Sequence, residues 1–115
     1  MAKSSEFHDY VIYDLMGDDP HITTRKMFGG YGLYKDSIIF GIIVENTLYF
    51  KVDESNKAAY EEYGSKPFHY SNGTKEVIMS YFEVPETILE DREKLFEWID
   101  QSTYISKERK TRKTR

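Results

Sequence analysis

Hydrophobic and polar residues alternate along much of the chain in short runs that predict strands. Residues 47–52 place Leu48, Phe50 and Val52 on one side and more polar residues on the other, which is the period-two pattern of a half-buried strand. Residues 38–44 are apolar at nearly every position. Such a strand is central and covered on both faces, or is covered on one face and paired with another chain on the other.

The same patterns predict five strands in all, at residues 25–34, 38–44, 47–52, 67–70 and 76–84. Helical spacing of apolar residues predicts a first helix starting at Ser4 or Ser5, a second one ending at Tyr63, and a last one capped by Asp91. Residues 85–89 are expected to form one helical turn. Tight turns are expected at Lys35-Asp36-Ser37 and Glu45-Asn46, and a hairpin at Asn72-Gly73. The main elements follow the order α-β-β-β-α-β-β-α.

This order predicts an α+β fold with an antiparallel five-stranded sheet, because consecutive hairpins pair neighbouring strands in opposite directions. The helices are expected on one face of the sheet. The other face is then only partly covered, and an open apolar face on a small sheet invites a second subunit.

Glycines interrupt the first two strands at Gly29, Gly30, Gly32 and Gly41. Glycine weakens a strand unless a bend or a close approach of backbone requires it. We therefore expect a bulge that curves the sheet, or a helix lying close on it. A phosphate loop is not expected, because no helix pattern follows these glycines.

Several separated blocks resemble the N-terminal domain of the TfoX (Sxy) family, over about residues 5–104. The blocks are Arg25–Tyr34, Phe40–Ile43, Leu48–Asp53, Gly64–Phe68 and Met79–Tyr81, the last followed by Val84-Pro85. The residues that carry the signature, which we expect to be structural, are Arg25, Met27, Phe28, Gly29, Gly30, Gly32, Leu33, Tyr34, Gly41, Tyr49, Lys51, Lys66 and Pro67.

The resemblance implies a fold like that of type III secretion chaperones and a role in natural competence, the uptake of DNA by bacteria. Full-length members look like transcription co-activators that work with the cyclic-AMP receptor protein. They also carry a second, C-terminal domain, so this chain is expected to be a stand-alone N-terminal domain. The resemblance implies no catalytic residues.

The composition fits one soluble domain. The chain has 115 residues, of which 39% are hydrophobic and 31% charged, as in ordinary globular proteins. It contains no cysteine, and its N-terminus lacks the apolar core of a signal peptide. A cytoplasmic protein without membrane contact is therefore expected. Aromatic residues make up 16%, which favours rings that fill the sheet, with stacking platforms for a partner as the alternative.

The charge is divided unevenly. The net charge is −4, but residues 107–115 alone carry +5 and the preceding 106 residues carry −9. We expect a globular domain over residues 1–106 and a basic, disordered tail over 107–115. The side chains that could contact nucleic acid are Lys107, Arg109, Lys110, Arg112, Lys113 and Arg115.

No catalytic, cofactor-binding or metal-binding residues are predicted. The imidazoles of His8, His21 and His69 lack partners at metal-ligand spacing, and no nucleophile stands in a recognisable motif. The sequence thus favours a non-catalytic regulatory domain that binds protein and forms a homodimer. The alternative is a small nucleic-acid-binding accessory protein that uses its basic tail.

Overall fold

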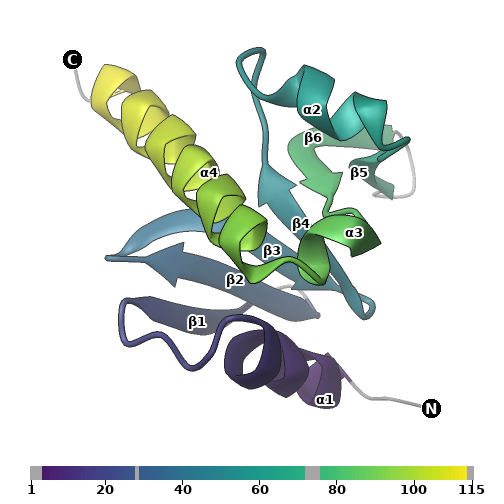
Figure 1. Cartoon of the computed structure of the whole chain (residues 1–115). Coiled ribbons are helices and arrows are strands. Elements are labelled where there is room, and N and C mark those ends of the chain that lie inside the picture. Colours follow the sequence, from purple (N-terminus) through teal and green to yellow (C-terminus); the bar gives the residue numbers. More distant parts are fainter. Residues whose placement is uncertain (1–3, 28, 72–75, 114–115) are drawn as a thin grey trace.

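One antiparallel sheet of six strands, with helices packed on it, forms the domain (Figure 1). The computed structural model describes residues 4–27, 29–71 and 76–113. The strands are β1 (Ile22–Met27), β2 (Gly30–Lys35), β3 (Ile38–Val44), β4 (Thr47–Lys51), β5 (Pro67–Ser71) and β6 (Glu76–Glu83). Their order across the sheet is β1-β2-β3-β4-β6-β5. The α+β class and the antiparallel sheet predicted from the sequence are confirmed.

The expected count of five strands is wrong. Residues 25–34, predicted as one strand, are divided between β1 and β2, which pair with each other from Ile22↔Lys35 to Met27↔Gly30. The chain reverses between those two residues, and Gly29 has a φ of +77°. A side chain disfavours that backbone conformation, so glycine allows the tight reversal. Phe28, the other residue of the turn, lies outside the described residues.

Two further reversals are two-residue turns, as predicted. Asp36 and Ser37 join β2 to β3, and Glu45 and Asn46 join β3 to β4; all four residues have positive φ. Positive φ at both central positions marks the type I′ hairpin turn, whose twist matches that of the strands. The hairpin predicted at Asn72-Gly73, between β5 and β6, lies outside the described residues.

Two strand glycines lie against the backbone of the next strand. A Cβ atom on Gly30 would come within 2.0 Å of the carbonyl oxygen of Ile43, and one on Gly41 within 2.6 Å of that of Tyr49. Both distances are too short for any side chain. The expected close approach is therefore real, but it is made by neighbouring strands and not by a helix.

The expected bulge is also present. Leu33 pairs with Gly41 while Tyr34 pairs with Ile39, so Phe40 has no partner across the β2–β3 ladder. An extra residue of this kind increases the local twist of a sheet. Phe40 is fully buried in the main core.

The helices are α1 (Ser4–Asp9), the π-helical segment η1 (Tyr10–Leu15), α2 (Lys57–Glu62), α3 (Glu86–Leu89) and α4 (Arg92–Lys113). Together they cover one face of the sheet. Leu95, Trp98 and Ile99 of α4 pack on Leu48 and Phe50 of the sheet in one apolar cluster. Asp91 caps α4 as predicted: its carboxylate accepts a hydrogen bond from the backbone N–H of Lys94 at 3.2 Å.

The last helix is longer than expected. α4 continues to Lys113. Residues 107–113, which were expected to belong to a disordered tail, therefore have a helical backbone. The helix carries buried side chains as far as Ile105 and Ser106, and this packed part gives the following turns a helical template to extend. Arg115 lies outside the described residues.

Replacing Gly30 with Ala is expected to destabilise the domain by about 3 kcal/mol or more, because β2 and β3 must separate to admit the methyl group. Gly29→Ala is the matched control. Nothing lies within 4 Å of its Cβ position, so only the positive φ costs free energy, about 1 kcal/mol. Urea denaturation of both variants measures the difference, and equal losses would contradict the close approach.

Candidate interaction surface on the open sheet face

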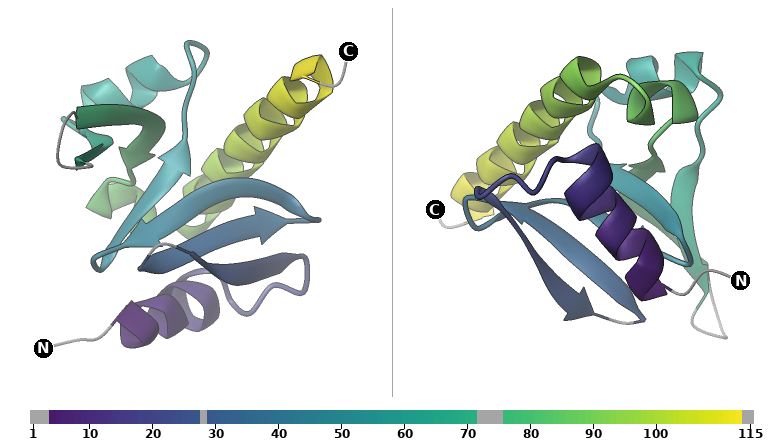
Figure 2. Two further views of the ribbon diagram at one scale, coloured as in Figure 1. Left: turned by 180° about the vertical axis from the view of Figure 1, so that it is seen from behind. Right: turned by 60° about the horizontal axis from the view of Figure 1, so that its bottom comes forward.

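The two faces of the sheet differ in what covers them. The main core includes residues from α1, η1, α2, α3 and α4 together with one face of the strands. The second apolar cluster, on the opposite face, contains only strand residues among those described: Ile42, Phe68 and Tyr81, with Ile39, Val44 and Tyr49 packed against them. Seen from behind, the strands lie in front of α4 (Figure 2, left). We call the side of this second cluster the open face.

One row of residues crosses the open face from the edge strand β1 to β6, the strand next to the other edge. Arg25 pairs with Gly32, Gly32 with Ile42, Ile42 with Tyr49 and Tyr49 with Glu83. Directly paired residues point to the same face of a sheet, so this row places a cation on β1 and an anion on β6. With adjacent strands about 4.8 Å apart, the two ends are separated by roughly 19 Å.

The middle of the open face is apolar and partly exposed. Ile42, at the centre of the row, is 2% exposed, while Met27, Tyr34, Val44 and Tyr49 around it are half-buried. The side chains of Met27 and Tyr34 lie over Gly32 and fill the space that the glycine leaves. Partial exposure of neighbouring apolar groups on one face is typical of a surface that a partner covers.

Aromatic contacts hold the β4–β6 side of the open face. The rings of Tyr49 and Phe68 meet edge to face at 5.0 Å between centroids. The Lys51 ammonium lies over the Tyr81 ring at 5.0 Å from its centroid, within the range of a cation–π interaction. These contacts order the side chains before any partner arrives, which lowers the entropy lost on binding.

Burial, together with the carboxylate at the β6 end of the row, affects the pKa of Tyr49. Burial, and then the nearby Glu83 carboxylate, raise the pKa of the Tyr49 phenol above its ordinary value. Both causes disfavour the phenolate, since one removes water from the charge and the other repels it. Tyr49 therefore keeps a neutral hydroxyl over the open face at physiological pH.

The signature residues fall into two groups in the structure. Arg25, Met27, Gly32, Tyr34, Tyr49 and Lys51 belong to the open face or its rim. Two others support the sheet: Leu33 is buried in the main core, and the Lys66 carbonyl accepts a hydrogen bond from the N–H of Glu83 at 3.1 Å. Pro67 begins β5.

Sequence reasoning missed Ile42 and Glu83 as members of the candidate surface. The signal was present in the alternation of β6, since Tyr81 and Glu83 share one face in a strand. That alternation became informative only once the register of β4 against β6 was known, because this pairing places Glu83 beside Tyr49.

Outside the open face, His8 is the most elaborately bonded imidazole. Its Nδ1 lies 2.9 Å from an Asp9 carboxylate oxygen and its Nε2 lies 3.0 Å from the Thr24 hydroxyl. Its ring stacks on Tyr31 with 4.3 Å between centroids. These contacts link α1 to β1 and β2, and they give the imidazole a structural role.

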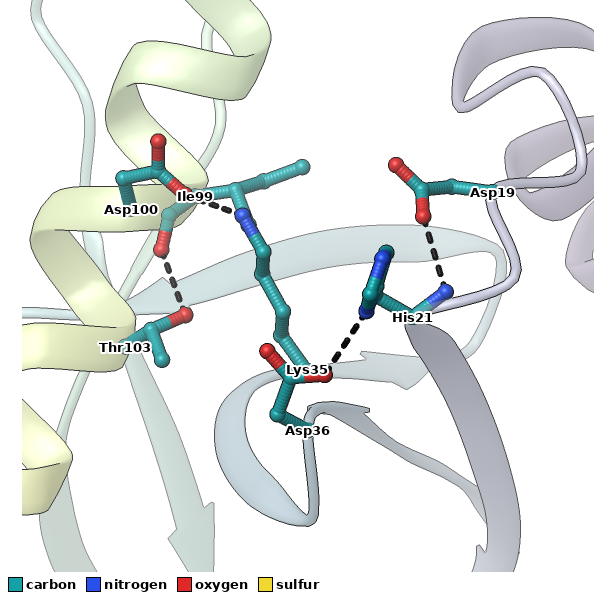
Figure 3. Close-up of polar contacts among 7 residues, drawn as sticks. All are labelled: Asp19, His21, Lys35, Asp36, Ile99, Asp100 and Thr103. Carbon is teal, nitrogen blue, oxygen red and sulfur yellow. Dashed lines mark hydrogen bonds and ion pairs between the residues drawn. The ribbon is translucent and has the colours of Figure 1, made fainter.

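A second polar cluster joins the hairpin ends to α4 (Figure 3). His21 Nδ1 lies 2.9 Å from an Asp36 carboxylate oxygen, and the N–H of His21 donates to Asp19 at 2.8 Å. Lys35 forms an ion pair with Asp100 of α4. Within the described part of the chain, no group of three or more His, Cys, Asp or Glu side chains could hold a metal ion.

Tyr60 is the most deeply buried ionisable side chain described. Burial raises the pKa of its phenol, an effect that the nearby Ser102 hydroxyl slightly opposes. No hydrogen bond of ordinary geometry reaches the Tyr60 hydroxyl from the described residues, because Ser102 donates instead to the Lys51 carbonyl at 2.8 Å. The ring packs against Trp98 with 4.5 Å between centroids, which makes Tyr60 part of the core under α4.

The basic segment lies at the far end of α4. The helix continues through residues 107–113 after Ser106, the last residue described as buried, and its end points away from the sheet (Figure 1). Lys107 and Glu108 are exposed. Among the described residues, no helix is long and apolar enough to span a membrane.

Fold and surface together define a small α+β domain with one helix-covered and one open sheet face. Residues 14–104 match the TfoX N-terminal domain family, and the chain belongs to that family. A curated relative, "DNA transformation protein TfoX1" from Aliivibrio fischeri (strain ATCC 700601 / ES114), is 32% identical over 62 residues. The match covers 54% of this chain and 30% of the relative, so it spans under a third of that protein.

Replacing Glu83 with Gln is expected to lower the pKa of Tyr49 while leaving it above the ordinary tyrosine value. The substitution removes the carboxylate but not the burial, which is the larger cause. Carbon-13 NMR of labelled tyrosine rings across a pH titration measures the change. Glu86→Gln, at an exposed position of α3, should leave the Tyr49 titration unchanged. An equal shift in both variants would contradict the placement of Glu83 beside Tyr49.

Proposed function

We propose that this domain is a non-catalytic, cytoplasmic module of competence-related regulation, and that it acts by binding protein through the open face. Family membership and the transformation-protein relative support the competence-related part. The observation that carries the binding part is the strand-only apolar cluster of the open face. Its half-buried rings lie on a rigid sheet, where little side-chain order is lost on association.

Regulation suits such a surface better than chemistry does. The imidazoles of His8 and His21 are engaged in contacts that join elements of the fold. Protein recognition requires a fixed apolar patch with polar edges, and the open face supplies both. The competence context suggests transcription regulation as the process that this binding serves, with a component of the transcription machinery as a further partner of the domain.

The test is a chromosomal Val44→Lys substitution in the organism that encodes the chain, read out as transformation frequency with added DNA. Val44 is half-buried on the open face, so the ammonium group should block an apolar partner. Loss of about 1.4 kcal/mol of binding free energy weakens the complex tenfold. We expect the transformation frequency to fall by about tenfold or more.

Lys26→Glu is the matched control, because it changes charge at an exposed position of β1 next to Arg25 but on the other face of the sheet. It should transform normally. If deletion of the whole gene leaves transformation unchanged, the competence-related role is wrong. If only Val44→Lys is neutral, the open face is not the binding surface.

A second candidate function is nucleic-acid binding by the end of α4. The observation that favours it is the helical backbone of residues 107–113, which holds a segment rich in Lys and Arg on one element. The remaining 106 residues carry a net charge of −9 and repel phosphate, so contact is expected through this segment alone.

Changing all six cations of residues 107–115 to Gln is expected to abolish DNA binding while keeping good helix formers in place. For the unchanged chain, the logarithm of the binding constant should fall with the logarithm of salt concentration at a slope of up to about 5, because six phosphate contacts release counterions. Fluorescence anisotropy with labelled duplex DNA measures both. Equal binding by the Gln variant would contradict this candidate.

A further inference from the structure

We propose that the partner of the open face is a second copy of this chain, related by a two-fold axis that runs parallel to β3 and passes above Ile42, between the two sheets. In this arrangement Arg25 of each copy faces Glu83 of the other. The proposal rests on the proposed function only in taking the open face as a binding surface. It names the occupant and the register.

The order of charges along the row carries the argument. A rotation by 180° about an axis along the central strand reverses the row of the second copy. Arg25 then lies opposite Glu83, and Glu83 lies opposite Arg25, so that each interface contains two opposite-charge pairs. Both side chains are exposed, and no ion pair within either copy joins them to another described residue. Self-complementarity of this kind is what an isologous dimer requires.

The apolar middle of the row is also self-complementary. Ile42 lies beneath the axis but is only 2% exposed, so the contact is made by the half-buried side chains around it. Tyr49 meets the Met27 and Tyr34 side chains that lie over Gly32, because Tyr49 and Gly32 are equally distant from Ile42 on opposite sides. Large half-buried groups therefore meet one another, and the charged groups lie at the rim, as in the general anatomy of protein interfaces.

The twist of the sheet does not force the two facing sheets apart. A two-fold axis along the central strand maps a uniformly twisted sheet onto a surface of the same shape, displaced by the thickness of the side chains between the sheets. Two facing sheets with nearly aligned strands are the common packing of β-sandwiches, about 10 Å apart. A copy with the same twist thus follows the open face wherever the twist is uniform, away from the bulge at Phe40.

A second copy also explains the pattern of exposed charge. The chain has a net charge of −4 at pH 7, so two copies repel each other at long range. Specific association then needs attraction at the contact itself, and the Arg25 and Glu83 positions provide it. A strongly basic or strongly acidic partner would leave one end of the row facing a like charge, which costs affinity.

The test measures self-association of Arg25→Glu, Glu83→Arg and their mixture by analytical ultracentrifugation at low salt. Each variant alone places like charges together at two sites, and we expect its dimer dissociation constant to rise at least about tenfold. In an equimolar mixture, Glu at position 25 of one variant meets Arg at position 83 of the other, and both remaining pairs stay attractive. The mixture should therefore form heterodimers with the affinity of the unchanged chain.

Lys26→Glu and Glu86→Lys are the matched controls, since they reverse exposed charges away from the open face and should not change dimerisation. Circular dichroism of each variant verifies folding, and recovery in the mixture is itself evidence that both single variants are folded. A chain that remains monomeric, or single variants that associate like the controls, would overturn the proposal.

The experiments can contradict either proposal without contradicting the other. If the chain is monomeric but Val44→Lys still reduces transformation, a different protein covers the open face and the second-copy assignment alone is wrong. If the charge-reversed variants behave as described but Val44→Lys transforms normally, the dimer stands and the competence-related binding role is wrong.

Discussion

The packing of α4 across β3 and β4 is the contact on which the rest of the structure depends. Leu95, Trp98 and Ile99 of this helix bury the apolar side chains of the central strands. Burial of a large aliphatic or aromatic side chain contributes about 1.5–3 kcal/mol, so this contact is a major part of the stability of a small domain. It also requires the helix and both strands to keep a fixed register, which the close approaches at Gly30 and Gly41 help to set.

The same contact decides what remains exposed. α1, η1 and α2 contribute to the core on the side of α4, and the opposite face is covered only by its own strand side chains as far as the structure describes them. Rings such as Tyr49 and Phe68 shield part of it by packing on each other. The remainder is an apolar surface with a cation on β1 and an anion on β6, and this surface gives the domain its proposed ability to bind protein.

Much of the fold could be predicted from local patterns. The two-residue turns at 36–37 and 45–46, the capped helix after Asp91 and the apolar β3 each depend on neighbouring residues, and they are present as expected. The strand count failed at Phe28-Gly29 because those residues continue an apolar pattern, and the chain reversal there depends on one glycine φ. The end of α4 also departed from expectation, since charge repulsion alone predicted disorder where the packed helix continues.

The sequence by itself determined the α+β class and the family, because periodicity, turn residues and signature blocks are local properties of the chain. Only the tertiary structure decided which residues share a surface. Arg25 and Glu83 are 58 positions apart in the sequence, and they belong to one row because β4 pairs with β6 and β1 pairs with β2. Pairing between distant strands is a non-local choice set by packing, and it places these two charges at opposite ends of one row.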